Sequence, residues 1–234
     1  NVQCLQSSNA KIENNTITTD YGQGQWGGDV SSAFNPERVG RGIQLDRSTA
    51  TIYNNTVLLQ MNDWEIQTGN DYIFFADSVV ALDISLSPNV LVENNWFTVE
   101  SRQGGAVPGI CINVTMKSSV KLYNNTCEFK SQNNWGYYPT HRIIQVAFAS
   151  SASISNCTLK MPTVLQGGGQ PVVQCIGISA LYGSTVVLYD MKLTAGTIAI
   201  IDGSHGILVC DPSPARIAEY RQRDRIEQQE AREL

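Results

Sequence analysis

One ten-residue pattern recurs six times along the chain and constrains the fold more than any other feature. Small polar residues lead into an apolar residue at every second position, then an asparagine pair or its remnant, then another apolar residue. The copies are SNAKIENNTI (8–17), STATIYNNTV (48–57), PNVLVENNWF (88–97), SSVKLYNNTC (118–127), SSASISNCTL (150–159) and STVVLYDMKL (184–193). They begin 40, 40, 30, 32 and 34 residues apart, and none contains an insertion. Such a period indicates a repeat architecture.

A second strand-like segment precedes each later copy. These segments are GIQLD (42–46), ALDISL (81–86), GICINV (109–114), IIQVAF (143–148) and CIGIS (175–179), and GILVC (206–210) is expected to start a seventh turn. Their apolar residues alternate, as in half-buried strands. No helical pattern separates the strands, which disfavours a Rossmann sheet or a TIM barrel, and a sandwich would show hairpin turns instead of one motif repeated in register. The sequence therefore predicts an all-β fold, a parallel β-helix of about six to seven turns.

The asparagine pair interrupts the alternation within each copy. Ala10 and Ile12 are expected to face the interior, yet the next apolar residue is Ile17. Asn tolerates the left-handed backbone of a sharp corner, and stacked turns would let equivalent amides bond to one another. The predicted structural ladder is Asn14, Asn54, Asn94, Asn124, Asn156 and Asp190, followed by an inward apolar column of Ile17, Val57, Phe97, Cys127, Leu159 and Leu193.

Glycosylation is the alternative role for these asparagines. Formal Asn-x-Thr sequons begin at Asn14, Asn54, Asn113, Asn124 and Asn156. We favour the ladder, because a packed corner is expected to be a poor substrate for a glycosyltransferase.

Charge and cysteine usage exclude several classes of function. The net charge of −5 argues against a nucleic-acid-binding surface, and no apolar run reaches the length of a membrane span. The six cysteines form no Cys-x-x-Cys pair and lack histidines at ligand spacing, so no metal and no cofactor are expected. We expect reduced structural thiols; disulfide pairing in a secreted protein is the minority alternative.

The last segment differs from the repeats. Residues 1–211 are predicted to form the β-helix domain, read as a fragment of a longer chain, and residues 212–234 a charged C-terminal α-helix. Ser213 is the expected N-cap, with Pro214 in the first helical position. This helix would cap the solenoid, support oligomerisation or link to a further domain, and a frayed solvated helix is the alternative.

Over residues 2–211, the order of strand, Ser-rich corner, strand and Asn corner resembles the pectate-lyase-like superfamily of right-handed parallel β-helices. The Asp-Asp pair of polygalacturonases and the Arg-x-Pro-x-x-Arg of pectate lyases are missing, and only Ser204-His205-Gly206 resembles a Gly-His-Gly motif. The Asn-, Ser-, Thr- and Gly-rich strands are most similar to phage tailspikes and tail fibres. That resemblance implies a virion-associated or extracellular homotrimer that recognises a host polysaccharide, with other virion proteins as possible partners of the C-terminal helix.

The long connections between repeats carry the candidate carbohydrate-binding residues. Flat aromatic rings beside amides suit the C–H faces and hydroxyls of sugars, although the same rings also fill packing sites and subunit interfaces. The candidates are Trp26, Trp64, Tyr72, Trp135, Tyr137 and Tyr138.

Hydrolysis of a glycan would require two carboxylates about 5–9.5 Å apart. Asp46 and Asp83 are expected on outward faces of adjacent turns, and Asp63 and Glu65 lie in an aromatic connection. The sequence thus leaves three functions open: a polysaccharide-recognising virion protein, a polysaccharide lyase or glycosidase of the same fold, and a purely structural capsid or tail module.

Overall fold

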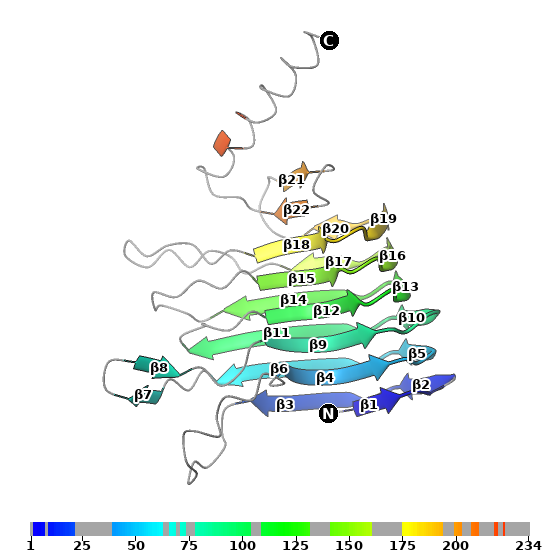
Figure 1. Cartoon of the computed structure of the whole chain (residues 1–234), viewed down its shortest axis with the longest axis horizontal. Helices are drawn as coiled ribbons and strands as arrows, with labels where there is room; N and C mark the ends of the chain where they lie inside the picture. The colour runs from blue at the N-terminus through cyan, green and yellow to red at the C-terminus, as the bar shows by residue number, and fades with distance from the viewer. Residues whose placement is uncertain are drawn as a thin grey trace.

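The computed structural model describes residues 2–7, 9–21, 39–62, 66–68, 71–73, 78–103, 109–131, 141–160, 175–193, 199–202, 207–210, 218–219 and 222. Within these residues nearly all regular structure is β-strand. The strands stack turn upon turn along one axis, with equivalent strands of successive turns lying side by side (Figure 1).

Three sheets form the solenoid, and each turn contributes one strand to each sheet. Sheet A contains β1 (Val2–Leu5), β4 (Val39–Asp46), β9 (Ser78–Ser85), β12 (Gly109–Thr115), β15 (His141–Val146) and β18 (Cys175–Ala180). Sheet B contains β2 (Ala10–Glu13), β5 (Ala50–Tyr53), β10 (Val90–Glu93), β13 (Ser119–Tyr123), β16 (Ser151–Ser155) and β19 (Thr185–Tyr189). Sheet C contains β3 (Thr16–Tyr21), β6 (Thr56–Asn62), β11 (Trp96–Gln103), β14 (Thr126–Ser131), β17 (Thr158–Lys160) and β20 (Lys192–Leu193).

All pairings between these eighteen strands are parallel. The register follows the sequence repeat, since the predicted apolar column from Ile17 to Leu193 is level across all six strands of sheet C. The predicted all-β solenoid with parallel sheets is therefore confirmed, whereas its right-handedness stays a prediction.

The predicted seventh turn is wrong. Ile207–Cys210 forms β22, which pairs antiparallel with β18 and with β21 (Ala199–Asp202). Only four residues separate β21 from β22 in the sequence. Such a short connection joins antiparallel strands, because a parallel pair needs a crossover of a dozen residues or more. Six turns of the solenoid lie within the described residues, and the hairpin extends sheet A beyond β18 (Figure 1).

The first asparagine of each pair turns the corner between sheets B and C. All six residues of the predicted ladder have positive φ, from 47° to 58°. Hydrogen bonds join Asn54 Nδ2 to Asn14 Oδ1 (2.7 Å), Asn124 Nδ2 to Asn94 Oδ1 (2.6 Å) and Asn156 Nδ2 to Asn124 Oδ1 (3.1 Å). This ladder lies on the surface, since Asn14, Asn54 and Asn124 are exposed.

The second asparagine forms another ladder, which sequence reasoning missed. Asn55, Asn95 and Asn125 are buried, and Asn15 stands at the start of the same column. Each side-chain oxygen accepts from both the backbone N–H and the amide of the preceding turn, at 2.8–3.0 Å. The ladder ends at Cys157, whose Sγ lies 3.9 Å from Asn125 Nδ2.

Serines form a third column at the opposite corner, between sheets A and B. The backbone N–H of each serine donates to the hydroxyl of the next turn's serine at 3.0–3.2 Å; the column is Ser7, Ser48, Ser87, Ser118, Ser150 and Ser184. Buried corners thus keep their backbone groups paired without water.

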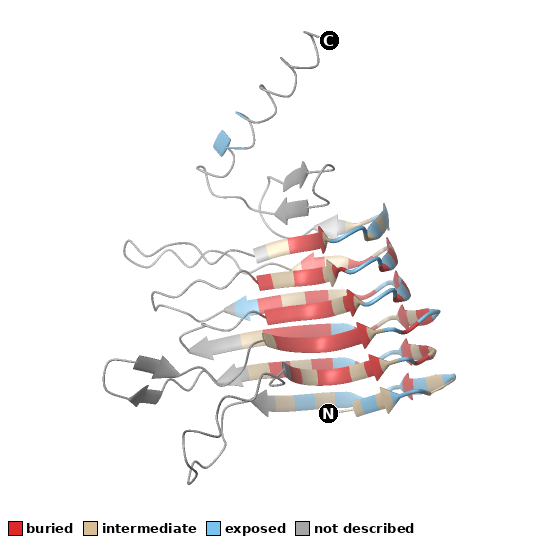
Figure 2. Ribbon diagram, in the orientation of Figure 1, coloured by how far each residue is buried: buried red, intermediate tan, exposed pale blue. Residues whose placement is uncertain are grey.

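The interior is apolar along the whole stack and is most deeply buried in the middle turns (Figure 2). Phe97, Phe129 and Ile112 are among the side chains with almost no exposed surface. At the sixth turn, Leu188 holds the core position level with Ile154 but is 40% exposed. The core therefore opens toward its last described turn.

The structure also bears on the connection after the second turn and on the predicted C-terminal helix. Ile66–Thr68 (β7) and Asp71–Ile73 (β8) form an antiparallel hairpin within a stretch expected to be a connection. Of the predicted C-terminal helix, only residues 218, 219 and 222 are described; all three are helical, and the helix as a whole stays a prediction. No helix among the described residues is long and apolar enough to cross a membrane.

Candidate functional site

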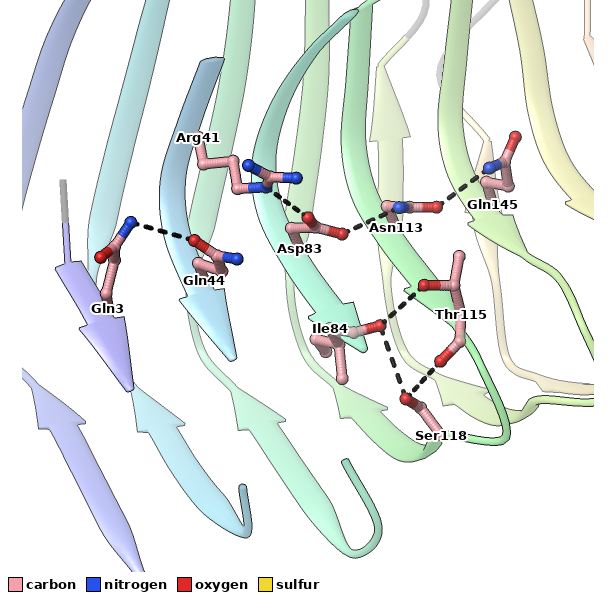
Figure 3. Close-up of polar contacts among 9 residues, drawn as sticks. All are labelled: Gln3, Arg41, Gln44, Asp83, Ile84, Asn113, Thr115, Ser118 and Gln145. Carbon is pink, nitrogen blue, oxygen red and sulfur yellow. Dashed lines mark hydrogen bonds and ion pairs between the residues drawn. The ribbon is translucent and has the colours of Figure 1, made fainter. Parts of the chain in front are cut away.

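A row of polar side chains crosses the outer face of sheet A (Figure 3). Its members are level in neighbouring strands: Gln3, Gln44, Asp83, Asn113, Gln145 and Ser179. We call this line the polar row. Gln3 Nε2 donates to Gln44 Oε1 at 3.0 Å, and Gln145 Nε2 donates to Asn113 Oδ1 at 3.0 Å.

Asp83 is the centre of the polar row. Its Oδ2 accepts from Arg41 Nε at 2.6 Å, and its Oδ1 accepts from Asn113 Nδ2 at 2.8 Å. The carboxylate is almost buried, with side-chain exposure of 10%, against 28% for Arg41. Both oxygens are thus held by donors, an arrangement that stabilises a buried charge and leaves little freedom to attack or protonate a ligand.

The polar row borders a buried apolar strip on the same sheet. Val80 and Ile110 are 2% and 6% exposed but stand apart from the interior core cluster. They lie level with each other and with Arg41 and Arg142 on the flanking strands. At the far end of the row, the Ser179 hydroxyl is buried without a hydrogen-bond partner.

The predicted pairing of Asp46 with Asp83 finds no support in the register. Gln44 is level with Asp83, while Asp46 is level with Ser85. Asp46 Oδ2 instead accepts from Arg47 Nη1 at 3.1 Å. Each carboxylate therefore has its own arginine, and a catalytic role for either stays a prediction.

A second cluster surrounds Trp96 on the outer face of sheet C. The indole is 44% exposed, and its Nε1 donates to Glu128 Oε2 at 3.3 Å. Lys160 Nζ lies 4.3 Å from the ring centroid, a cation–π contact reaching back across two strands. Lys130 Nζ is 3.7 Å from the same Glu128 oxygen. The ring is thus oriented by a carboxylate and a cation while remaining open to solvent.

The buried histidine and cysteines of the described interior are in unreactive protonation states. His141 is 2% exposed, stacks on Phe129 and accepts from the Gly109 N–H through Nδ1 at 3.0 Å. Burial, and then the charge of Arg142, lower the pKa of His141 to about 4, so the ring is neutral at pH 7. Burial raises the pKa of the Cys111 thiol to about 12 and also raises the pKa values of Cys127 and Cys157.

The thiol prediction holds for the four cysteines that the structure characterises. Cys4, Cys111, Cys127 and Cys157 are free, and all but Cys4 are buried. Buried protonated thiols are poor nucleophiles and poor metal ligands. Among the described residues, no group of three or more His, Cys, Asp or Glu side chains could hold a metal ion.

Most of the predicted catalytic and carbohydrate-binding residues lie outside the described part of the chain. These are Trp26, Asp63, Trp64, Glu65, Trp135, Tyr137 and Tyr138. Tyr72 lies in β8, where its backbone pairs with Gln67.

Sequence reasoning missed Arg41 and Trp96. Trp96 could have been found by parity, because it precedes the inward-facing Phe97 and must therefore face outward. Arg41 carries no comparable signal, since its contact with Asp83 spans a whole turn. Comparison of the chain with protein families, with curated proteins and with solved structures gave no match.

Proposed function

We propose that this chain is a polysaccharide-recognising β-helix of the phage tailspike or tail-fibre type, with Trp96 as a contact for the sugar. The observation that carries the proposal is the oriented, solvent-open Trp96 ring between Glu128 and Lys160. The placement on a virion rests on the sequence resemblance alone.

The chemistry around Trp96 suits a saccharide. An aromatic face packs against the C–H face of a pyranose, while a neighbouring carboxylate accepts from its hydroxyls. An exposed cation–π contact is worth only about 0.5–1 kcal/mol, so a sugar can displace Lys160 from the ring at small cost. The displaced ammonium then donates to a hydroxyl or carboxylate of the ligand. Lys130 adds a second cation nearby, which favours acidic glycans.

The two described catalytic candidates, Asp46 and Asp83, favour recognition over hydrolysis. Both Asp83 oxygens accept from Arg41 and Asn113, and Asp46 is held by Arg47. A glycosidase needs one carboxylic acid and one carboxylate free to reach the bond between two sugars. We therefore rank a glycosidase that relies on Asp46 and Asp83 behind a binding protein.

Incubation with purified neutral and acidic surface polysaccharides from candidate hosts tests the proposal. We expect binding by titration calorimetry without release of reducing ends and without an unsaturated product absorbing in the near ultraviolet. Reducing ends would instead indicate hydrolysis, and an unsaturated product would indicate a lyase. A folded protein that binds none of the glycans contradicts the proposal and leaves the structural module.

The Trp96 contact is tested separately. Trp96→Ala should weaken binding at least about tenfold, or about 1.4 kcal/mol. Tyr123→Ala is the matched control, because Tyr123 is 47% exposed but lies on sheet B. Equal loss in both variants, or none in Trp96→Ala, rules out a specific role for this ring.

A further inference from the structure

Large apolar side chains line the corner between sheets A and B, on the outside of the solenoid. They belong to four successive turns. Leu86 and Met116 directly follow their sheet A strands, whereas one residue separates Phe148 and Tyr182 from theirs. They are 39%, 48%, 46% and 69% exposed. We call these four residues the corner ridge.

The backbone conformation at the corner ridge is unusual for large apolar residues. Leu86, Met116, Phe148 and Tyr182 have φ of 50°, 58°, 56° and 55°, in the left-handed region that bulky residues rarely adopt. In the last three turns the following residue also has positive φ, a pattern that favours Asn-Gly.

The other corner of the same solenoid shows what the backbone alone would select. There, five asparagines and one aspartate occupy the positive-φ positions. Asn or Gly at the corner ridge would suit the backbone better and would expose less apolar surface to water. Contact between neighbouring turns, as between Phe148 and Tyr182, accounts for part of this choice, but it leaves apolar surface exposed at a strained backbone. Exposed strain of this kind points to an interaction surface.

The ridge suits a protein partner better than a sugar. The rings of Phe148 and Tyr182 stack on each other, with centroids 4.8 Å apart and planes 11° from parallel. Each ring thereby covers one face of the other, and Leu86 and Met116 have no flat face. Met and stacked aromatic side chains are typical of the apolar centre of protein interfaces.

We propose that the corner ridge is a self-association surface, and that its partner is a second copy of this chain. Adjacent turns of the solenoid are about 4.8 Å apart, so the four side chains of the ridge have the same spacing. A partner that contacts all four in the same way needs contacting groups at this spacing. The ridge of another copy has that repeat, and a rotation axis beside the ridge generates a closed assembly.

Size and charge are compatible with this partner. Four such side chains supply on the order of 300 Å² per copy, against about 800 Å² in a standard interface, so the ridge forms the apolar centre. The exposed Ser119, Ser151 and Thr185 beside it are neutral and suit a rim between identical surfaces. Arg47 at one end is paired with Asp46, and Lys117 is long enough to keep its ammonium in water.

The double variant Phe148→Asn/Tyr182→Asn tests the proposal by sedimentation velocity over a concentration series of the whole chain. We expect concentration-dependent association of the unaltered protein and at least tenfold weaker association of the variant. Because Asn suits positive φ, the variant should keep or raise the melting temperature measured at a concentration where both proteins are monomeric. Loss of association together with stability would instead mean damage to the fold, and would count against the proposal.

The control is Tyr53→Thr/Tyr123→Thr, which removes two exposed aromatic rings from sheet B and keeps strand-forming residues. It should associate like the unaltered chain. A chain that stays monomeric at every concentration overturns the proposal. So does a Phe148→Asn/Tyr182→Asn variant that associates normally.

Discussion

At the residue scale, the two asparagines of each pair have different roles, one at the surface and one in the interior. The first residue supplies the left-handed corner, and the second supplies amide groups to a buried column. A side chain in that column must both donate and accept hydrogen bonds, as Asn95 does. Its Nδ2 donates to Ile52 O at 2.9 Å, and its Oδ1 accepts from the Asn55 N–H at 2.8 Å. A carboxamide is the side chain that both donates and accepts at such a position.

Asn95→Ala should therefore be strongly destabilising. It leaves the Asn55 N–H buried without its acceptor, which costs about 1–3 kcal/mol, and removes a donor from the Ile52 and Glu93 carbonyls, at about 1 kcal/mol each. We expect a loss of about 4 kcal/mol in the free energy of unfolding, measured by urea denaturation. Asn94→Gly is the control, because it keeps the positive φ and removes only a surface amide; it should cost less than about 1 kcal/mol. Equal losses would contradict the assignment of the buried ladder to the second asparagine.

His141 makes stability depend on pH. Its pKa is about 4 in the folded protein and about 6.5 in an unfolded chain, so the unfolded state binds the extra proton between these values. Stability from this group is complete above pH 6.5 and decreases as the pH falls toward 4, by about 3 kcal/mol in total. His141→Gln should show a flatter dependence than the unaltered chain between pH 7 and 4.5 in urea denaturation. A parallel dependence in both proteins would rule out His141 as the cause.

The alternation of apolar residues in the sequence predicted several features at the residue scale. It identified the corner at the first asparagine and the inward column from Ile17 to Leu159, since both follow from local alternation. The second asparagine faces inward because the corner consumes one residue, and alternation alone does not show this. The contact between Arg41 and Asp83 joins residues 42 positions apart, so it depends on a register that no local pattern contains.

At the element scale, the sequence predicted strand positions but not the direction of the last one. GILVC alternates like GICINV, and an alternating strand has the same pattern in parallel and antiparallel pairing. The preceding AIID strand, four residues away, decides the outcome by forming a hairpin. The hairpin covers the edge of β18, which would otherwise offer its backbone groups to another chain.

Removal of this hairpin should expose that edge. A chain ending at residue 193 lacks β21 and β22, whereas a chain ending at residue 211 keeps them and lacks only the predicted helix segment. We expect the shorter chain to aggregate with strand-type infrared absorption and the longer one to stay dispersed in light scattering. Aggregation of both chains would assign the protection to residues 212–234 instead.

At the scale of the whole molecule, stability depends on position along the stack. Each turn contacts only its neighbours, so the free energy of opening is smallest at the ends and largest in the middle. Burial follows this order: Val92 and Leu122 have almost no exposed surface, whereas the equivalent Leu188 is 40% exposed. In contrast to a globular core, the weak end can open without loss of the centre.

Hydrogen exchange measured by mass spectrometry tests this gradient. Peptides covering β9, β12 and β15 should exchange slowest, while those covering β18 and β19 should exchange at least about a hundredfold faster, which corresponds to about 2.7 kcal/mol. Peptides covering β1 and β2 should also exchange faster than the centre, because Leu5 is 57% exposed.

Asn95→Ala provides the internal control, since a break in the third turn should speed exchange there and in its neighbours before it affects β18. Uniform exchange across all six turns would show that the solenoid opens as one cooperative unit and would contradict nearest-neighbour stacking as the source of its stability.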